Sequence, residues 1–200
     1  MGVPIHSQLM PTVNCAVKLL TKNIKRCGQK TLAKGVNEIF YIGMKDGQQI
    51  AFTLDSTNDT IITGMAMGTG QKLFAYEGNN FSNDPSVGFN KSDNGITLPQ
   101  QLVFSLYSNS PATKKEIQAL LTRKDLVIIY NRVSGDYEVM GANTGMSVSN
   151  FVYRPNDDNK GAFVITLAAP DEDQLPKTFI HTTSNVEDTA TFLGTMVAPD

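Results

Sequence analysis

The chain has 200 residues, with 17 Lys or Arg against 19 Asp or Glu, so its formal net charge is −2. This length fits one domain, or one domain with an extended arm. The charge balance excludes a generally basic nucleic-acid-binding protein, and no apolar run is long enough for a transmembrane helix. Basic residues interrupt the short apolar stretches near the start, so we expect neither a signal peptide nor a membrane partner.

Residues that favour β-strands dominate the composition, because Val, Ile, Thr, Phe and Tyr together make up 62 of the 200 residues. Few charges and many Thr, Asn and Ser are typical of chains that cover long β surfaces and many turns. The composition therefore resembles that of virion, secreted or assembly proteins more than that of cytosolic enzymes.

Residues 1–35 differ from the rest of the chain, since they hold six Lys or Arg and no Asp or Glu. Val17, Leu20 and Ile24 follow a roughly helical spacing. We predict that this segment is a basic N-terminal arm that orders against a partner, with a short helix as the alternative.

From Val36 onward the pattern changes to strands and tight turns. Asp46-Gly47 is a turn pair that favours a two-residue hairpin between the first two predicted strands. Antiparallel pairing of consecutive strands predicts a meander. Its four strands are predicted at residues 38–44, 49–55, 60–67 and 72–76.

Residues 77–95 are rich in Asn and Gly and show no hydrophobic periodicity, which predicts a long loop. Such a segment cannot bury enough apolar surface to offset its own ordering entropy. Exposed aromatic side chains in a free loop would be a liability without a partner. We therefore predict an assembly loop, ordered by a neighbouring subunit through Phe81, Val87 and Phe89.

One helix is predicted over residues 113–124. A Ser-Pro pair at 110–111 supplies a cap and a favoured first helical residue. Ile117, Leu120 and Leu121 form one apolar stripe, which we expect to pack on a sheet because the helix is too short to stand alone.

Further strands bring the total to nine or ten. The segment 126–130 is apolar at every position, so we predict that it is a central strand. This pattern predicts a mainly β fold, an antiparallel β-barrel or sandwich flanked by one short α-helix, over residues 36–175. Residues 176–200 are predicted to be a C-terminal arm. The other strands in this half are predicted at 97–108, 137–140, 147–153 and 162–167.

No motif predicts a catalytic residue, a cofactor or a metal site. The glycine-rich segment 64–72 lacks the Lys placement of a phosphate loop, which favours a glycine-bent strand. The acidic segment at 157–161 lacks calcium-loop spacing and is interpreted as a turn. The carboxylates at 171–173 are interpreted as a solvated loop, with a loosely held metal ion as the alternative. Neither His6 nor His181 adjoins a nucleophile motif, so we do not expect an enzyme.

The two cysteines, Cys15 and Cys27, are too few for a structural zinc site. Two reduced thiols are the simplest interpretation, since no secretory signal is visible, and a disulfide between them is the alternative.

Taken in order from Val36, the features resemble those of phage tail tube (major tail) proteins, of the kind found in phages of Bacteroidetes bacteria. The resemblance covers about two-thirds of the chain. It rests on the segments 36–42, 100–106, 114–123, 125–130, 135–141, 144–146, 160–167 and 170–173.

The resemblance implies a subunit that assembles as hexameric rings, which stack into a tube through which DNA passes. Its partners would be further copies of itself, other tail proteins and DNA bound without sequence specificity. It implies a location in the virion, after synthesis in the host bacterial cytoplasm. The alternatives are a monomeric or dimeric β-barrel binding module, such as an adhesin, and a small hydrolase with an unrecognised site.

Overall fold

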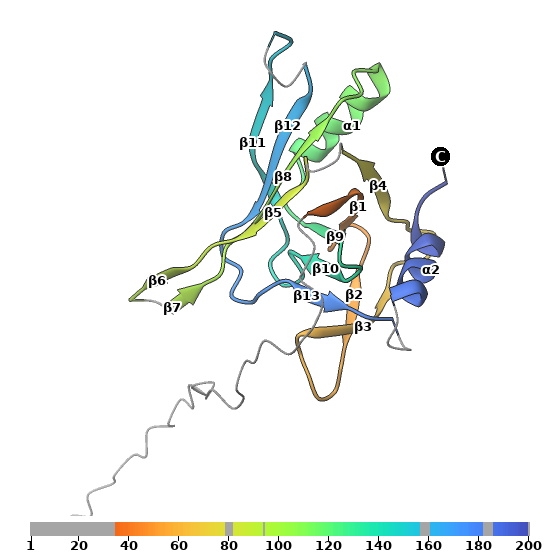
Figure 1. The fold of residues 1–200 in the computed structure, drawn as a ribbon, viewed down its shortest axis with the longest axis vertical. Coiled ribbons are helices and arrows are strands. Elements are labelled where there is room, and N and C mark those ends of the chain that lie inside the picture. The colour runs from red at the N-terminus through yellow and green to blue at the C-terminus, as the bar shows by residue number, and fades with distance from the viewer. Residues whose placement is uncertain (1–34, 79–81, 94, 157–160, 182–185, 200) are drawn as a thin grey trace, which may run out of the picture. The chain divides into compact units, whose positions relative to one another are not determined.

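Two β-sheets, a separate two-stranded hairpin and two helices make up the described part of the chain in a computed structural model (Figure 1). The structure describes residues 35–78, 82–93, 95–156, 161–181 and 186–199. The predicted N-terminal arm with its two cysteines and His6 lies outside these residues, as do Phe81 and most of the turn predicted at 157–161. The fold is mainly β, as the composition predicted.

The larger sheet has seven strands, and its neighbours are antiparallel except for the pair β3 and β13. Several neighbouring strands in this sheet are far apart in the sequence, such as β3 and β13 or β9 and β1. In spatial order the strands are β2 (Ala51–Leu54), β3 (Ile61–Ala66), β13 (Lys177–Phe179), β10 (Tyr137–Met140), β9 (Leu126–Arg132), β1 (Val36–Met44) and β4 (Phe74–Glu77).

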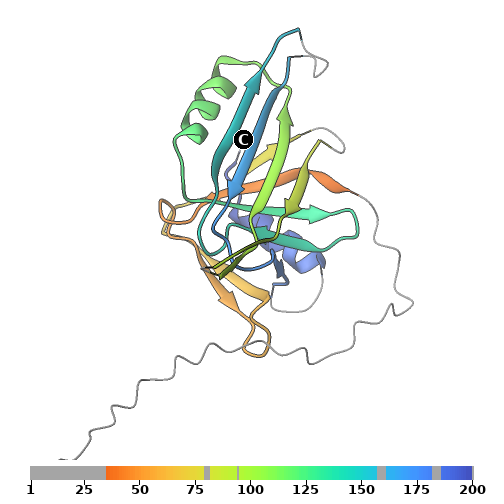
Figure 2. The same ribbon diagram turned by 90° about the vertical axis from the view of Figure 1, so that its left-hand side faces the viewer.

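The smaller sheet has four antiparallel strands, which Figure 2 shows side by side. Neither sheet closes into a barrel, so the barrel alternative is wrong and the arrangement is sandwich-like. In spatial order the four strands are β11 (Ser147–Tyr153), β12 (Phe163–Ala169), β8 (Gln100–Leu106) and β5 (Asp84–Val87), and the separate hairpin is β6 (Asn90–Ser92) with β7 (Gly95–Thr97).

Alternate residues of β9 belong to two different hydrophobic cores, because successive side chains of a strand point to opposite faces. Ile128 and Tyr130 lie in the first core, which the two sheets share, whereas Val127 and Ile129 lie in a second core on the other face of the larger sheet. Strand β9 pairs with β1 on one side and β10 on the other, so its predicted central position is confirmed.

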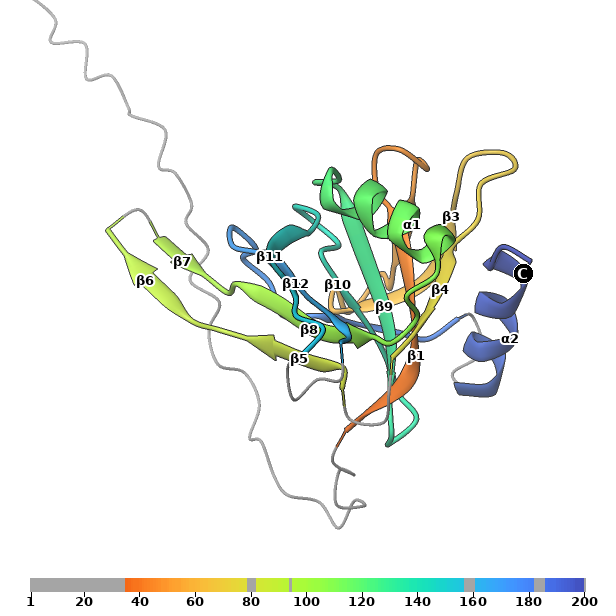
Figure 3. The same cartoon turned by 90° about the horizontal axis from the view of Figure 1, so that it is seen from above.

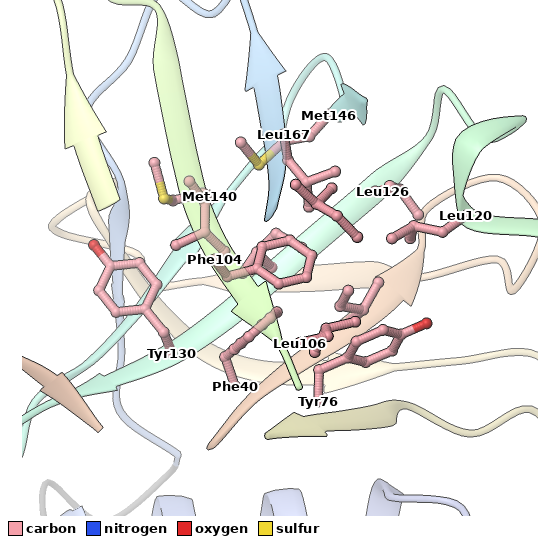
Figure 4. Packing of buried hydrophobic residues seen from close by; sticks show 14 of the residues in the cluster. Phe40, Tyr76, Phe104, Leu106, Leu120, Leu126, Tyr130, Met140, Met146 and Leu167 are labelled. Atoms are coloured by element: carbon pink, nitrogen blue, oxygen red, sulfur yellow. The ribbon is translucent and has the colours of Figure 1, made fainter. Parts of the chain in front are cut away.

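Aromatic rings from both sheets meet in the first core (Figure 4). The ring of Phe40 on β1 meets that of Phe104 on β8 edge-on, with centroids 4.9 Å apart, and Tyr76 on β4 lies beside both. Edge-to-face pairs of this kind add to the stabilisation from burial alone. They fix the smaller sheet against the larger one.

Helix α1 spans Pro111–Leu121, so it begins and ends slightly earlier than predicted. The Ser110 hydroxyl caps it by accepting a hydrogen bond from the Thr113 amide at 3.1 Å. Ile117 and Leu120 are buried in the first core, which confirms most of the predicted stripe, whereas Leu121 is exposed.

The C-terminal segment contributes two elements that were not predicted. Strand β13 is hydrogen bonded between β3 and β10 within the larger sheet, and a second helix, α2 (Val186–Met196), follows it. Leu193 of α2 is buried in the second core, and the Phe192 ring meets that of Phe179 edge-on at 6.0 Å. Figure 3 shows α2 on the side of the larger sheet away from the smaller one, so the described part of the chain has two helices where one was predicted.

The predicted hairpin between the first two strands is wrong, because β1 and β2 are not neighbours in the sheet. The chain turns over residues 45–49 instead, with the Gln48 amide donating to the Met44 carbonyl at 2.8 Å and Gln49 at a positive φ of 54°. This wider turn leads the chain away from β1, whose two edges pair with β4 and β9.

Candidate interaction surface

The segment predicted as a long loop, residues 77–95, is largely strand, so that prediction is wrong. Strand β5 pairs with β8, and β6 pairs with β7. The sequence does contain a turn signal here, the run Ser92-Asp93-Asn94-Gly95 of turn-favouring residues, although Gly95 itself is paired with Ser92 in the hairpin. The lack of apolar periodicity hid it, since β6 and β7 have no buried face.

The β6–β7 hairpin extends beyond the smaller sheet, as Figures 1 and 3 both show. Its base is held by a hydrogen bond from the Gly88 amide to the Pro99 carbonyl at 2.8 Å. The Leu98 amide also donates to the Glu172 carbonyl at 2.6 Å. Within the described residues, no other strand pairs with β6 or β7, so the base alone fixes the hairpin's direction.

Hydrogen bonds of two buried polar side chains, Gln100 and Glu172, stabilise the base of the hairpin. The Gln100 side-chain oxygen accepts a hydrogen bond from the Gly141 amide at 2.9 Å, and its nitrogen donates to the Gln174 carbonyl at 2.8 Å. The Glu172 carboxylate is buried and accepts a hydrogen bond from the Thr144 hydroxyl at 3.0 Å. Glu172 is therefore a structural residue, which corrects the interpretation of residues 171–173 as a solvated loop.

Apolar side chains are unusually exposed on and beside this hairpin. Phe89 is 64% exposed, Ile96 on β7 is 53% exposed and Val87 on β5 is 38% exposed. Two of these residues, Val87 and Phe89, are those that the sequence predicted for contact with a neighbouring subunit. The structure brings them together at one end of the smaller sheet and adds Ile96, which sequence reasoning missed.

The opposite edge of the smaller sheet, strand β11, is also exposed. Its residues Phe151 and Tyr153 stack on Phe163 of β12 with centroids 6.1 and 4.5 Å apart, yet more than a third of each remains accessible. Both edges of this sheet thus present unpaired backbone and apolar side chains within the described residues. An edge of this kind is a template for pairing with another chain.

The face of the smaller sheet that points away from the first core carries both polar and apolar side chains. Alternation from the buried residues assigns to it the polar residues Asp84, Gln101, Ser105 and Thr166, of which Ser105 and Thr166 are buried, together with Val103, Val152 and Val164. None of the four strands contains Lys or Arg. A sheet without cations offers no partner for the phosphates of a nucleic acid.

A polar cluster near β5 is satisfied internally. The Tyr130 hydroxyl donates to the Glu138 carboxylate, which also pairs with Arg132 at 3.1 Å. Burial and the neighbouring Glu138 raise the pKa of Tyr130, so the hydroxyl stays protonated and remains a donor. The three side chains form a structural network beneath the edge strand.

The remaining motifs take structural places. Gly64 lies in β3 beside a register shift between β2 and β3, which agrees with the predicted glycine-bent strand at that position. The rest of that prediction is wrong, because β3 ends at Ala66 and Gly68 and Gly70 lie outside any strand. The His181 ring stacks on Phe192 of α2 with centroids 3.9 Å apart. Among the described residues, no group of three or more His, Cys, Asp or Glu could hold a metal ion.

Comparison of the chain with protein-family models, curated proteins and solved structures identifies no match. No helix within the described ranges is both long and apolar enough to cross a membrane. Strand pairing and exposure define the candidate site, which consists of the two free edges of the smaller sheet and the β6–β7 hairpin at one of them.

Proposed function

We propose that the protein is a structural virion protein, a subunit that assembles as rings, with six copies as the expected number, which stack into a phage tail tube for DNA. The observation that carries the proposal is the smaller sheet, whose edge strands β5 and β11 both lack a strand partner among the described residues and both carry exposed apolar side chains. Surfaces of this kind need a partner to be stable in solution.

The strand directions suit a ring. The sheet has four alternating antiparallel strands, so β5 and β11 run in opposite directions. A neighbouring copy related by rotation presents its β5 to this β11 in the antiparallel sense. Repetition of the contact continues one sheet around the ring, and closure leaves no free edge.

The cation-free face of the smaller sheet is the surface that we assign to the lumen. A conduit must let DNA slide, and Lys or Arg along the wall would hold its phosphates. Gln101 is exposed on this face, and none of the four strands adds a positive charge to it. The second core and α2 would then lie on the outer side of the tube, where other tail proteins could bind.

A matched pair of valines tests the proposal. Val87 lies on the edge strand β5 and Val133 between β9 and β10, and the two side chains are 38% and 47% exposed. Val87→Lys should leave the fold stable to within about 0.5 kcal/mol, as exposed sites generally do, but prevent rings and tubes. Val133→Lys should assemble normally, as judged by negative-stain microscopy and native mass spectrometry.

Two results would contradict the proposal. A wild-type protein that remains monomeric or dimeric at micromolar concentration would favour a binding module. Normal assembly of the Val87→Lys variant would show that the β5 edge is not the contact.

A further inference from the structure

We infer that a groove between β4 and α1 receives the β6–β7 hairpin of a second copy. This inference rests on the proposed function. It names a second contact between copies, separate from the pairing of the edges of the smaller sheet. The groove has a volume of about 640 Å³. Its lining includes Phe74 and Glu77 of β4, Leu106 of β8, Glu116 and Ile117 of α1, and Pro199.

One wall of the groove is a sheet edge that already accepts an extended chain. The Leu73 amide donates to the Met196 carbonyl at 2.8 Å, and the Ala198 amide donates to the Leu73 carbonyl at 2.9 Å. This bridge is parallel and involves a single residue of the edge. It leaves the rest of β4 without a strand on its outer side among the described residues.

The direction of the free backbone groups follows from the pairing with β1. The Gly78 amide donates to the Glu38 carbonyl at 3.0 Å, and Tyr76 is paired with Phe40, so alternate residues from Gly78 backward bond to β1. Ala75 and Glu77 therefore direct their amides and carbonyls away from β1. Strand addition needs such a row of outward donors and acceptors.

The floor and rim of the groove match the hairpin in chemistry. Ile117 and Leu106 are buried apolar residues at the floor, whereas the rim carries the exposed carboxylate of Glu116. The Tyr76 hydroxyl holds Glu116 at 3.2 Å, which positions one carboxylate beside the edge strand.

On the hairpin, Ile96 of β7 is directly opposite Lys91 of β6, so the two side chains share one face. That face presents an exposed apolar group beside a cation. Docked in the groove, it places Ile96 on the apolar floor and Lys91 beside the Glu116 carboxylate of the rim.

The contact has to be made between copies. Figures 1 and 3 place the hairpin on the opposite side of the described body from β4 and α1. The hairpin and the groove are different surfaces, so each copy can give one contact and receive another. Head-to-tail contacts of this type generate open or ring-closed assemblies from one interface.

Cysteine cross-linking between two preparations tests the contact, with Cys15 and Cys27 first replaced by Ser. One preparation carries Ile96→Cys, and the other carries Ala112→Cys on α1 in the groove lining. The matched control is Ala119→Cys, an exposed alanine on the same helix that does not line the groove. After mixing under assembly conditions and mild oxidation, the disulfide-linked heterodimer is quantified on a non-reducing gel.

We expect about tenfold more heterodimer with Ala112→Cys than with Ala119→Cys, because docking raises the local concentration of the two thiols. Equal yields from assembled protein would overturn the inference while leaving the proposed function intact. Absence of any assembly would overturn both.

A charge exchange gives a second readout on the same contact. Lys91→Glu should weaken assembly, and Glu116→Lys in the same chain should restore it in part, since the pair would keep opposite charges. A double variant that assembles no better than Lys91→Glu would contradict the placement of Lys91 at the rim.

Discussion

The carboxylate of Asp125 accepts a hydrogen bond from the backbone amide of Gly47 at 2.9 Å, across 78 residues of sequence. The same carboxylate pairs with the Arg123 guanidinium at 2.6 Å. Burial alone would raise the pKa of Asp125, but the hydrogen bonds from Arg123 and Gly47 outweigh it and hold this pKa below its ordinary value. The turn after β1 is therefore held by a side chain of the segment that joins α1 to β9.

Asp125→Asn should destabilise the fold at neutral pH by about 1 kcal/mol, because it removes a charged partner of Arg123 while keeping the shape. A carboxylate with a lowered pKa contributes stability that is present above its unfolded pKa, near 4, and lost as the pH falls through its folded pKa. The difference between variant and wild type in urea unfolding should thus shrink below about pH 4. Asp46→Asn, at an exposed position in the same turn, is the control; an equal loss there would contradict the assignment.

Truncation of the hairpin should abolish assembly without unfolding the protein. Residues 89–98 can be replaced by a Gly-Ser link, because Gly88 and Pro99 are already joined by a 2.8 Å hydrogen bond. This keeps β5 paired with β8, whereas a deletion of 80–93 would remove β5. Circular dichroism and the melting temperature should show a folded monomer. Normal tubes from this variant would mean that the hairpin plays no part in assembly.

The sequence predicted most elements of this fold but few of their partners. Local patterns identified β1, β8 and α1, since each has a buried face that shows in its own residues, and β9, whose apolar run is buried on both faces. It could not place β13 between β3 and β10, because three residues carry no period and the pairing spans more than a hundred positions. The same limit explains the incorrect meander, in which consecutive strands were expected to pair.

The candidate interaction surface and the one predicted from the sequence share two residues. Val87 and Phe89 were identified from apolar residues in a polar context, and that signal is independent of secondary structure. Ile96 and the β4 edge were missed, since exposure and a missing strand partner are properties of the tertiary fold.

Two adjacent leucines on α1 separate core from surface. Leu120 is 4% exposed and Leu121 is 39% exposed. Leu120→Ala should lower the free energy of unfolding by about 2 to 4 kcal/mol, the range for a buried Leu in a core that does not fully collapse. Leu121→Ala should cost less than about 1 kcal/mol. Equal costs in denaturant unfolding would show that α1 does not pack its Leu120 face on the sheets.

Gln100 is buried, and its side chain links the base of the hairpin to Gly141 and Gln174. Gln100→Ala should cost about 1 to 3 kcal/mol, because it leaves the buried Gly141 amide and the half-buried Gln174 carbonyl without these partners. Gln101→Ala is the control, since its exposed side chain lies on the opposite face of β8.

The Gln100 variant also separates stability from assembly. Its lost hydrogen bonds lie where β8 leaves the hairpin, so hydrogen exchange should rise first at residues 98–100 while β9 stays protected. Assembly should then require a higher protein concentration than for Gln101→Ala, because each docking event has to order a looser hairpin. If both variants assemble at the same concentration, the direction of the hairpin is set elsewhere, and the hydrogen bond between Leu98 and Glu172 would be the contact to remove next.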